Sequence, residues 1–228
     1  MSIYAISDLH LSFGTNKPMN VFGKIWYNYE EKIKENWIKT VKDEDTVLIP
    51  GDISWGMTLK ETIPDFKFIN DLPGKKIISR GNHDYYFSTK NKLDKFFIEN
   101  NFDSLKLLHN NAYEVENVVI AGTRGWGKTE NNDAELDEKI IKREENRLII
   151  SLECANSISK EKEKIVALHF PPFIGRFEEI MHEYNVKKCI YGHLHGYGHS
   201  LVREGCIEGI EYIMVGCDYN NFEICKII

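Results

Sequence analysis

The chain has 228 residues, of which 42% are hydrophobic and 28% charged, and its formal net charge is −6. This profile is typical of a soluble globular protein with a core large enough to fold without disulfides. The acidic balance argues against a surface built to bind duplex nucleic acid, which is usually basic.

Short apolar runs bounded by turn residues predict buried strands, and longer stretches with apolar residues at helical spacing predict helices. In chain order, the predicted strands cover residues 3–7, 46–50, 76–79, 118–122, 165–169, 189–191, 210–215 and 222–227, with a candidate hairpin of 113–115 and 118–120. The predicted helices cover residues 25–41, 58–72, 88–101, 132–159 and 175–184, and Asn132 or Asp133 is the candidate cap of the fourth.

The order of these elements indicates the fold class. Strands and helices alternate in the first half, which predicts parallel βαβ units, and the C-terminal end is mostly strand, which predicts an antiparallel section. We therefore expect an α/β (α+β) fold, and two packed sheets with helices outside fit this order. The sequence contains no repeat, low-complexity tract or Pro/Ser-rich linker, so we expect one domain over residues 1–228.

Cysteine usage and the N-terminal sequence indicate the compartment. The five cysteines form an odd set without CxxC spacing, which is typical of reduced, mostly buried thiols. The first residues lack a basic segment followed by a long apolar one, and no apolar run reaches membrane-spanning length. We expect a cytoplasmic protein without a membrane partner.

Polar residues gather immediately after five of the predicted strands. The clusters are Asp8-Leu9-His10, Gly51-Asp52, Arg80-Gly81-Asn82-His83-Asp84, His169 and Gly192-His193-Leu194-His195. In open α/β sheets, ligands bind beyond the carboxyl ends of the strands, so these clusters are expected to meet. Five of the chain's eight histidines lie in them, which supports the same interpretation.

The residue types in these clusters favour a metal site. Carboxylate oxygen, amide oxygen and imidazole nitrogen suit divalent Mn, Fe and Zn, and the absence of cysteine argues against a structural thiolate zinc site. Asp-x-His and His-x-His on an extended segment direct both side chains the same way. Each motif alone is weak, because a lone Asp-x-His is more often a capping Asp and a surface His. The five together favour a metal centre.

These motifs resemble those of the calcineurin-like metallophosphoesterases. The family pattern is D-x-H, then G-D, then G-N-H-(D/E), then H, then G-H-x-H, and the chain matches every element between Asp8 and His195. The resemblance covers most of the chain and implies a two-sheet sandwich flanked by helices. It also implies a phosphoesterase that hydrolyses phosphomonoesters or phosphodiesters.

The resemblance implies a role for each matched residue. Two divalent ions are expected, with Mn²⁺ preferred and Fe or Zn as alternatives. The first would be held by Asp8, His10 and His195, and the second by Asn82, His169 and His193, with Asp52 bridging both. His83 would act at the leaving-group oxygen, oriented by Asp84. Hydrolysis would proceed by metal-activated hydroxide without a covalent phosphoenzyme.

The substrate is the least determined part. Ser54-Trp55 and the stretch from Gly122 to Trp126 resemble a small bacterial branch of phosphohydrolases without a settled substrate. Arg124 and Lys128 could bind phosphate oxygens, and Trp126 could stack on an apolar leaving group. Alternatively, this stretch is a surface loop whose Trp packs against the helix that begins near residue 132.

We expect a small phosphorylated substrate and leave the oligomeric state open. Two other functions remain open at this point. One is a nuclease of the same family, against which the acidic balance argues. The other is a catalytically silent binding scaffold, against which the complete motif set argues, because a scaffold need not keep its metal ligands.

Overall fold

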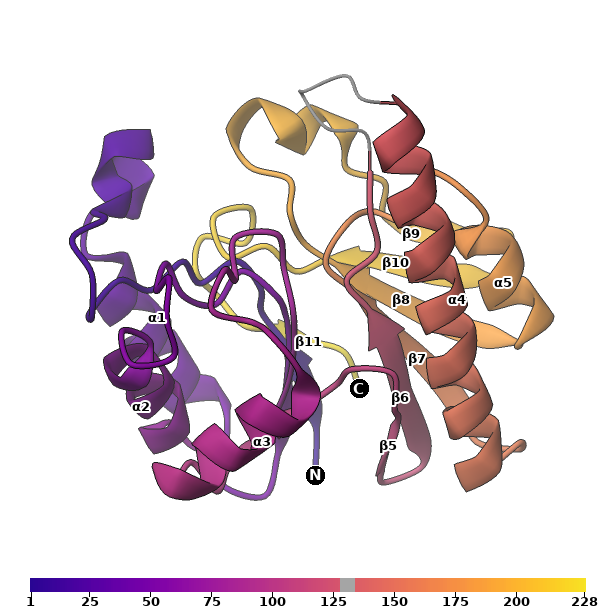
Figure 1. The fold of residues 1–228 in the computed structure, drawn as a ribbon, viewed down its shortest axis with the longest axis horizontal. Coiled ribbons are helices and arrows are strands. Elements are labelled where there is room, and N and C mark those ends of the chain that lie inside the picture. The colour runs from indigo at the N-terminus through magenta and orange to yellow at the C-terminus, as the bar shows by residue number, and fades with distance from the viewer. Residues whose placement is uncertain (128–133) are drawn as a thin grey trace.

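Two β-sheets pack face to face, and helices cover the outer face of each sheet (Figure 1). The computed structural model describes residues 1–127 and 134–228. One apolar cluster, which includes Ala5, Leu48, Ile120, Ile165 and Ile190, lies between the sheets. The expected two-sheet α/β fold is confirmed.

The first sheet has five strands in the order β11-β1-β2-β3-β4. Four of them run parallel, and β11 pairs antiparallel with β1 at the edge. Their bounds are β1 Ile3–Ala5, β2 Thr46–Pro50, β3 Lys75–Ser79, β4 Leu105–Leu107 and β11 Cys225–Lys226. The carboxyl ends of the parallel strands therefore lie at one edge of this sheet.

The second sheet has six strands in the order β5-β6-β7-β8-β10-β9. The four central strands run parallel, and β5 and β9 pair antiparallel at the two edges. Their bounds are β5 Tyr113–Val115, β6 Val118–Thr123, β7 Glu163–Leu168, β8 Val186–Tyr191, β9 Gly205–Ile207 and β10 Ile210–Met214.

Each sheet carries its own helices on its outer face (Figure 1). The first carries α1 Tyr29–Thr40, α2 Ile63–Asp71 and α3 Lys90–Glu99, and the second carries α4 Ala134–Ile158 and α5 Phe177–Glu183. Short 3-10 helices are η1 Met19–Phe22, η2 Lys24–Trp26 and η3 Gly196–Leu201. Among the described residues, no helix is both long and apolar enough to cross a bilayer.

The structure corrects some expected elements. The C-terminal part is mixed, because β10 pairs parallel with β8 although β9–β10 and β11–β1 are antiparallel. The strand expected over 222–227 is reduced to β11, since Phe222 sits in a turn with φ 62°. Both β4 and β9 were missed, because three residues at a sheet edge carry little periodicity. Asn132 and Asp133 lie outside the described residues.

A buried aspartate ties together the two loops that follow β1 and β2. Asp65, in the first turn of α2, accepts hydrogen bonds from the amide of Phe13 at 2.8 Å and from the Ser54 hydroxyl. The hydroxyl oxygen of Ser54 in turn accepts from the amide of Gly56 at 3.0 Å. These loops carry His10 and Asp52, so Asp65 restrains both from the helix side. Burial raises its pKa to about 6.

This pKa predicts a pH-dependent contribution of Asp65 to stability. A carboxyl whose pKa is about 6 when folded and 3.8 ordinarily stabilises the fold at low pH, and this contribution is lost as pH rises through 6. Asp65→Asn removes it. The free energy of unfolding of the parent minus that of the variant should therefore fall by about 2 kcal/mol between pH 4 and 7. Denaturant unfolding at several pH values measures this, and a difference that is flat or rises with pH contradicts it.

Candidate metal centre

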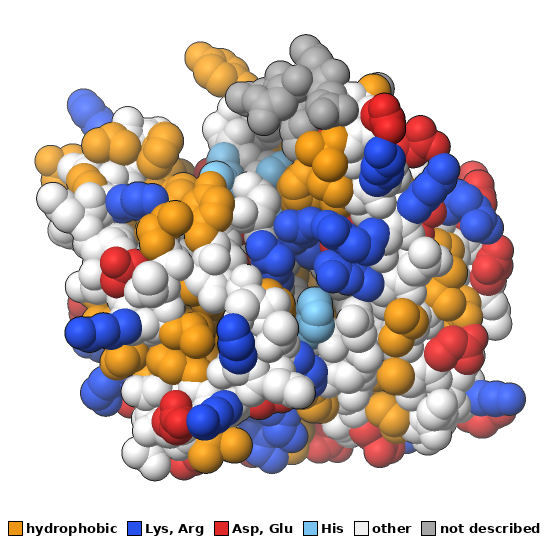
Figure 2. Space-filling model, viewed as in Figure 1, with side chains coloured by type: hydrophobic (Ala, Val, Ile, Leu, Met, Phe, Trp, Pro, Cys, Tyr) orange, Lys and Arg blue, Asp and Glu red, His pale blue; other side chains and the backbone are white. Residues whose placement is uncertain are grey.

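The five polar clusters meet where the carboxyl ends of both sheets converge. Figure 2 shows histidine side chains in the hollow between the two halves of the molecule. Hydrogen bonds cross between the sheets here: the His169 ring bonds the carbonyl of Pro50 at 3.0 Å, and the amide of His193 donates to Asp8 at 3.1 Å. Side chains from both sheets therefore build one site.

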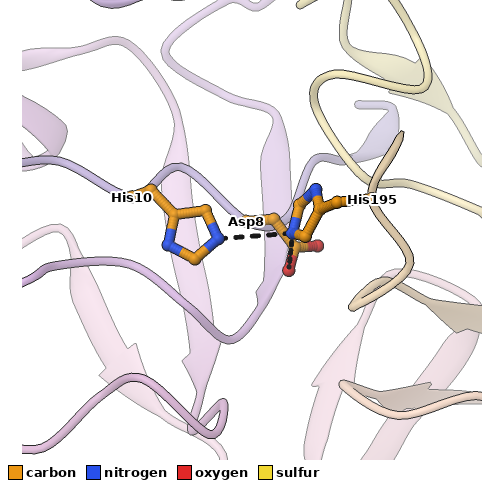
Figure 3. A group of neighbouring side chains, drawn as sticks. All are labelled: Asp8, His10 and His195. Atoms are coloured by element: carbon orange, nitrogen blue, oxygen red, sulfur yellow. Dashed lines mark hydrogen bonds and ion pairs between the residues drawn. The ribbon is translucent and has the colours of Figure 1, made fainter. Parts of the chain in front are cut away.

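Asp8, His10 and His195 form the first group of potential ligands. One ligand atom from each lies within 4.8 Å of the others. Nε2 of His195 is 3.3 Å from Nε2 of His10 and 3.3 Å from Oδ1 of Asp8. Figure 3 shows the His195 ring facing His10 with the Asp8 carboxylate beside it, so three donors point at one small volume.

Asp8, Asp52 and His169 form the second group, also within 4.8 Å. Nε2 of His169 is 2.7 Å from Oδ1 of Asn82 and 3.4 Å from Oδ2 of Asp52. The same oxygen of Asp52 is 3.8 Å from Nε2 of His10. Asp52 therefore lies between the two groups, where a bridging carboxylate would be needed.

His193 stands beside these groups without joining either. Its ring centroid is 5.1 Å from that of His169 and 4.0 Å from that of Phe170, on which it packs. Its amide donates to both oxygens of Asp8 at 3.1 and 3.2 Å. The backbone of His193 therefore orients Asp8, and its ring lies on the His169 side of the site.

The carboxylates are strongly coupled to their surroundings. Burial raises the pKa of Asp52 well above its usual range, and the charges of Asp84 and Asp8 raise it further. Burial alone would also raise the pKa of Asp8, but His195, His169 and His10 outweigh it and lower that pKa far below the usual range. Buried carboxylates that repel one another are stabilised by a cation placed between them.

The imidazoles are mostly held in the neutral form, as metal ligands must be. Burial lowers the pKa of His169 to about 4 and that of His193 to about 3, and it also lowers the pKa of His10. His195 is the exception. Burial alone would lower its pKa, but its hydrogen bonds to Asp218 and Asp8 and their charges raise it to about 10.

Backbone geometry gives a separate indication that these residues are suited to a metal. Four of the expected ligands adopt left-handed backbone conformations, with φ of 60° at Asp8, 45° at His10, 51° at Asp52 and 73° at His193. Each such residue costs roughly 1–2 kcal/mol, and strain of this kind concentrates at functional sites. The oxygen and nitrogen donors, their convergence and this strain all fit divalent cations.

Two motif glycines leave the room that the aspartates occupy. A Cβ on Gly81 would strike Oδ1 of Asp52, and a Cβ on Gly192 would strike Oδ2 of Asp8 and the hydroxyl of Ser7. Neither glycine has a positive φ. Glycine is therefore needed at these positions because the neighbouring carboxylate approaches the backbone closely, and not because the backbone conformation is unusual.

His83 lies beside the first group of ligands. Its amide donates to Asp52 at 2.8 Å, its Nδ1 is 3.1 Å from the Tyr85 hydroxyl, and its ring centroid is 4.7 Å from that of Trp55. Burial lowers its pKa. Tyr85 is thus the residue that contacts the His83 ring nitrogen, where Asp84 was expected to orient the ring.

The carboxylate of Asp84 instead binds backbone. It accepts hydrogen bonds from the amides of Gly81 at 2.7 Å, Asp52 at 2.9 Å and Ile53 at 2.9 Å, and from the Tyr86 hydroxyl at 3.0 Å. Among the described residues it forms no hydrogen bond with His83. Asp84 therefore positions the loop that carries Asp52.

Sequence reasoning did not place Asp218 at the site, and it singled out Trp55 only as part of the Ser54-Trp55 resemblance, without a contact to a ligand. Oδ1 of Asp218 lies 2.8 Å from Nδ1 of His195 and fixes that ring. Trp55 stacks on His10 with centroids 5.0 Å apart. Asp218 follows β10 just as the ligands follow their strands, so the same positional argument, extended to residues 210–215, would have found it. The stacking of Trp55 on His10 could not be predicted, because no residue spacing in the sequence indicates that these two rings meet.

The segment from Gly122 to Gly127 begins in the last residues of β6, continues beyond it and lies next to His169. Both His169 and Phe170 donate their amides to the carbonyl of Arg124, at 3.0 and 2.9 Å. The Trp126 ring packs between the Arg124 guanidinium, 4.4 Å away, and Phe170, 4.9 Å away, and its indole donates to Asp137 on α4. Substrate contact by Trp126 stays a prediction, and Lys128 lies outside the described residues.

Two cavities open beside the centre, one on each side of η3. The larger, of about 720 Å³, is lined by His10, His83 and His195 together with Met19, Phe22, Ile25, Trp26 and Trp55. The other, of about 600 Å³, is lined by His193, Phe170, Phe173, Leu201 and Arg203 among others. Both are mainly apolar, so each could take a carbon-rich group attached to a phosphorus atom held at the centre.

Comparison with known proteins identifies relatives of the whole arrangement. The family model described as calcineurin-like phosphoesterase matches residues 1–197. The Gene 66 protein of Mycobacterium phage L5 is 35% identical over 78 residues, which are 34% of this chain and 37% of that protein. The match thus spans little more than a third of that relative's length.

Solved structures share the fold over nearly the full chain. A phosphopantetheinyl hydrolase from Mycobacterium tuberculosis has a TM-score of 0.60 at 11% identity and covers 100% of this chain and 95% of its own. A protein of unknown function from Aquifex aeolicus has a TM-score of 0.54 at 22% identity, covering 99% and 95%. A Thermus thermophilus protein has a TM-score of 0.56 at 11% identity, covering 98% and 96%. At these identities the likeness concerns the fold alone.

The close approach at Gly192 predicts a selective loss of metal affinity. Gly192→Ala should displace the Asp8 carboxylate and weaken divalent-metal binding by about 10–100-fold, as changes to groups that orient metal ligands do. Calorimetric titration with Mn²⁺ measures the effect. Gly198→Ala is the control, because its Cβ would make only ordinary contacts with Leu194 at 3.5 and 3.6 Å. Equal affinities in both variants contradict the assignment of Asp8 as a ligand.

Proposed function

This chain belongs to the calcineurin-like phosphoesterases, and on that premise we propose that it hydrolyses a small phosphorylated molecule with the help of two divalent cations. It is a metal-dependent phosphoesterase. The observation that carries the two-cation proposal is the pair of potential ligand groups that share Asp8 and meet at Asp52.

Each proposed ligand has a place in this arrangement. Asp8, His10 and His195 would hold one cation, and Asn82, His169 and His193 the other, with Asp52 between them. The contact of Asn82 with His169 at 2.7 Å and the position of Asp52 support this division. Mn²⁺ is the proposed ion, with Fe or Zn as alternatives, because mixed oxygen and nitrogen donors do not demand zinc.

When bound, such cations polarise phosphoryl oxygens and lower the pKa of a water molecule, which supplies the nucleophile. His83 would act at the leaving-group oxygen. The Tyr85 hydroxyl, as donor to Nδ1, leaves the proton of a neutral His83 ring on Nε2, from which it can be donated. Asp84 would act as a positioning residue, since its hydrogen bonds hold Asp52 and, through Gly81, the start of the Asn82-His83 segment.

The cavities support a substrate with a carbon-rich part. The larger one places aromatic and aliphatic side chains directly beside His10 and His83. Arg124 would contact phosphate oxygens, and Trp126, which packs on its guanidinium, would contact the substrate or hold Arg124 in place. One structure of the same fold is a phosphopantetheinyl hydrolase, so phosphopantetheinyl compounds belong in a substrate screen. The choice between monoester and diester belongs to the same screen.

Removal of metal is expected to abolish activity. The protein should bind two divalent ions per chain, chelation should stop hydrolysis of p-nitrophenyl phosphate, and Mn²⁺ should restore it best. Asp52→Ala should retain less than one ion per chain, because this carboxylate would bridge both ions and lies 3.8 Å from His10 and 3.4 Å from His169. Asp71→Ala, an exposed aspartate on α2, is the control. Full activity after exhaustive chelation contradicts the proposal, and salt-dependent binding of an oligonucleotide would favour the nuclease alternative.

The role of His83 predicts a dependence on the leaving group. His83→Ala should keep its metal content but lose about 10²–10⁴-fold in rate on an alkyl phosphate, the usual value of general acid–base help. The loss should shrink for p-nitrophenyl phosphate, whose leaving group needs no proton. His182→Ala, a histidine on α5 outside the site, serves as the control. A loss of equal size for both substrates would exclude His83 as the proton donor.

A further inference from the structure

Arginine side chains gather beside the His169 half of the centre, around one buried glutamate. Glu144 of α4 is fully buried, and its Oε1 lies 2.6 Å from Arg147, 3.5 Å from Arg124 and 3.7 Å from Arg143. Figure 2 shows Lys and Arg side chains grouped near the middle of this face, next to the histidines of the hollow.

Arg80 belongs to the same group, on the side of the first sheet. Its guanidinium lies over the Phe87 ring at 5.2 Å, and that ring is 5.1 Å from His109. Burial lowers the pKa of His109 to about 4, and the charges of Arg147 and Arg80 lower it further. The charges of Arg80, which follows β3, and of Arg147, on α4, therefore both act on this histidine. We call Arg80, Arg124, Arg143 and Arg147 the arginine cluster.

The arginine cluster holds more positive charge than its protein partners neutralise. The guanidinium groups of Arg124, Arg143 and Arg147 share one carboxylate, that of Glu144, whose second oxygen already accepts from the Thr123 hydroxyl at 2.6 Å. Arg80 forms no ion pair among the described residues. The Nε atoms of Arg80 and Arg124 are buried without a hydrogen-bond partner. The Arg124 side chain as a whole is only 9% exposed, so water reaches little of it. Among the described residues, the cluster therefore carries more positive charge than negative and two unused donors, in a protein whose net charge is −6.

The cluster lies within reach of the phosphorus position. Arg80 precedes Asn82 by two residues, so their Cα atoms are at most about 8 Å apart. The carbonyl of Arg124 accepts the amide of His169 at 3.0 Å. Arg80 and Arg124 thus flank Asn82 and His169 along the chain, so the cluster lies next to the half of the centre that these two residues form.

We propose that the arginine cluster binds a phosphate group other than the one being hydrolysed, so that the preferred substrate carries a second phosphate. A phosphate has several oxygens and about two negative charges, which suit planar guanidinium forks better than a single carboxylate does. Free inorganic phosphate shares this chemistry and is the alternative source of the group. The part of this proposal that concerns the substrate rests on the proposed function. The part that concerns anion binding rests on the arginine cluster alone.

A kinetic comparison tests the substrate-borne phosphate. Adenosine 3′,5′-bisphosphate and adenosine 5′-monophosphate are the probes. The parent should have the lower KM for the bisphosphate, and Arg147→Gln and Arg80→Gln should each reduce this preference about tenfold or more, the value of one charge-assisted hydrogen bond. Arg147→Gln withdraws the closest partner of buried Glu144, whereas Arg80→Gln does not, so the second variant tests the charge without disturbing that pair.

Lys142→Gln is the matched control. It removes the same charge from the same helix at a position 68% exposed and paired with Glu138, and the preference should not change. Far-ultraviolet circular dichroism and thermal unfolding check that each variant is folded.

A binding measurement on chelator-treated protein separates the cluster from the metal centre. Inorganic phosphate and pyrophosphate should bind to the parent and to Lys142→Gln, and about tenfold or more weaker to Arg80→Gln and Arg147→Gln. Anion binding that depends on Arg80 without any preference for the bisphosphate identifies free phosphate as the occupant. If neither binding nor preference changes in the arginine variants, the proposal is overturned. Anion binding by a parent protein that hydrolyses no aryl phosphate even when loaded with Mn²⁺ would contradict the proposed function instead.

Discussion

The carboxylate of Asp84 is fully buried, and its hydrogen bonds hold two loops in a single arrangement. It accepts from Asp52 and Ile53 after β2 and from Gly81 after β3. Those amides have no strand partner at this point, so without Asp84 they would be buried and unsatisfied, at a cost of about 1–3 kcal/mol each. The positions of Asp52, Asn82 and His83 all depend on this one side chain. Its oxygens bond the backbone of both loops and do not join either group of potential ligands.

The centre is also where the two sheets are joined. Asp8 and Asp52 come from the first sheet, and His169, His193 and His195 from the second, and hydrogen bonds between Pro50 and His169 and between His193 and Asp8 link them directly. A cation bound here would contact both sheets, so metal binding and sheet packing stabilise each other. The left-handed backbone of four expected ligands is tolerated because the surrounding contacts hold it in place.

Charge is divided sharply across this edge of the molecule. Carboxylates and imidazoles, which suit cations, face one another at the strand ends, and the arginine cluster, which suits anions, stands beside the His169 half. The carboxylate of Glu144, on α4, neutralises part of the positive charge of the cluster. An acidic protein can therefore accept a phosphorylated compound, because the local charges at the site differ from the net charge of the chain.

The sequence by itself determined most of the strands and helices and the positions of the polar clusters, because strand periodicity and residues such as Gly51-Asp52 or Gly192-His193 are local signals. Only the tertiary structure decided which groups face each other. Asp218 reaches His195, Tyr85 contacts His83, and Asp84 binds the loop of Asp52. Arg80 and Arg147 come together only when both sheets pack, and β10 takes β8 as its parallel partner only through pairing between segments distant in the chain. Such contacts depend on distances in space, which residue spacing does not encode.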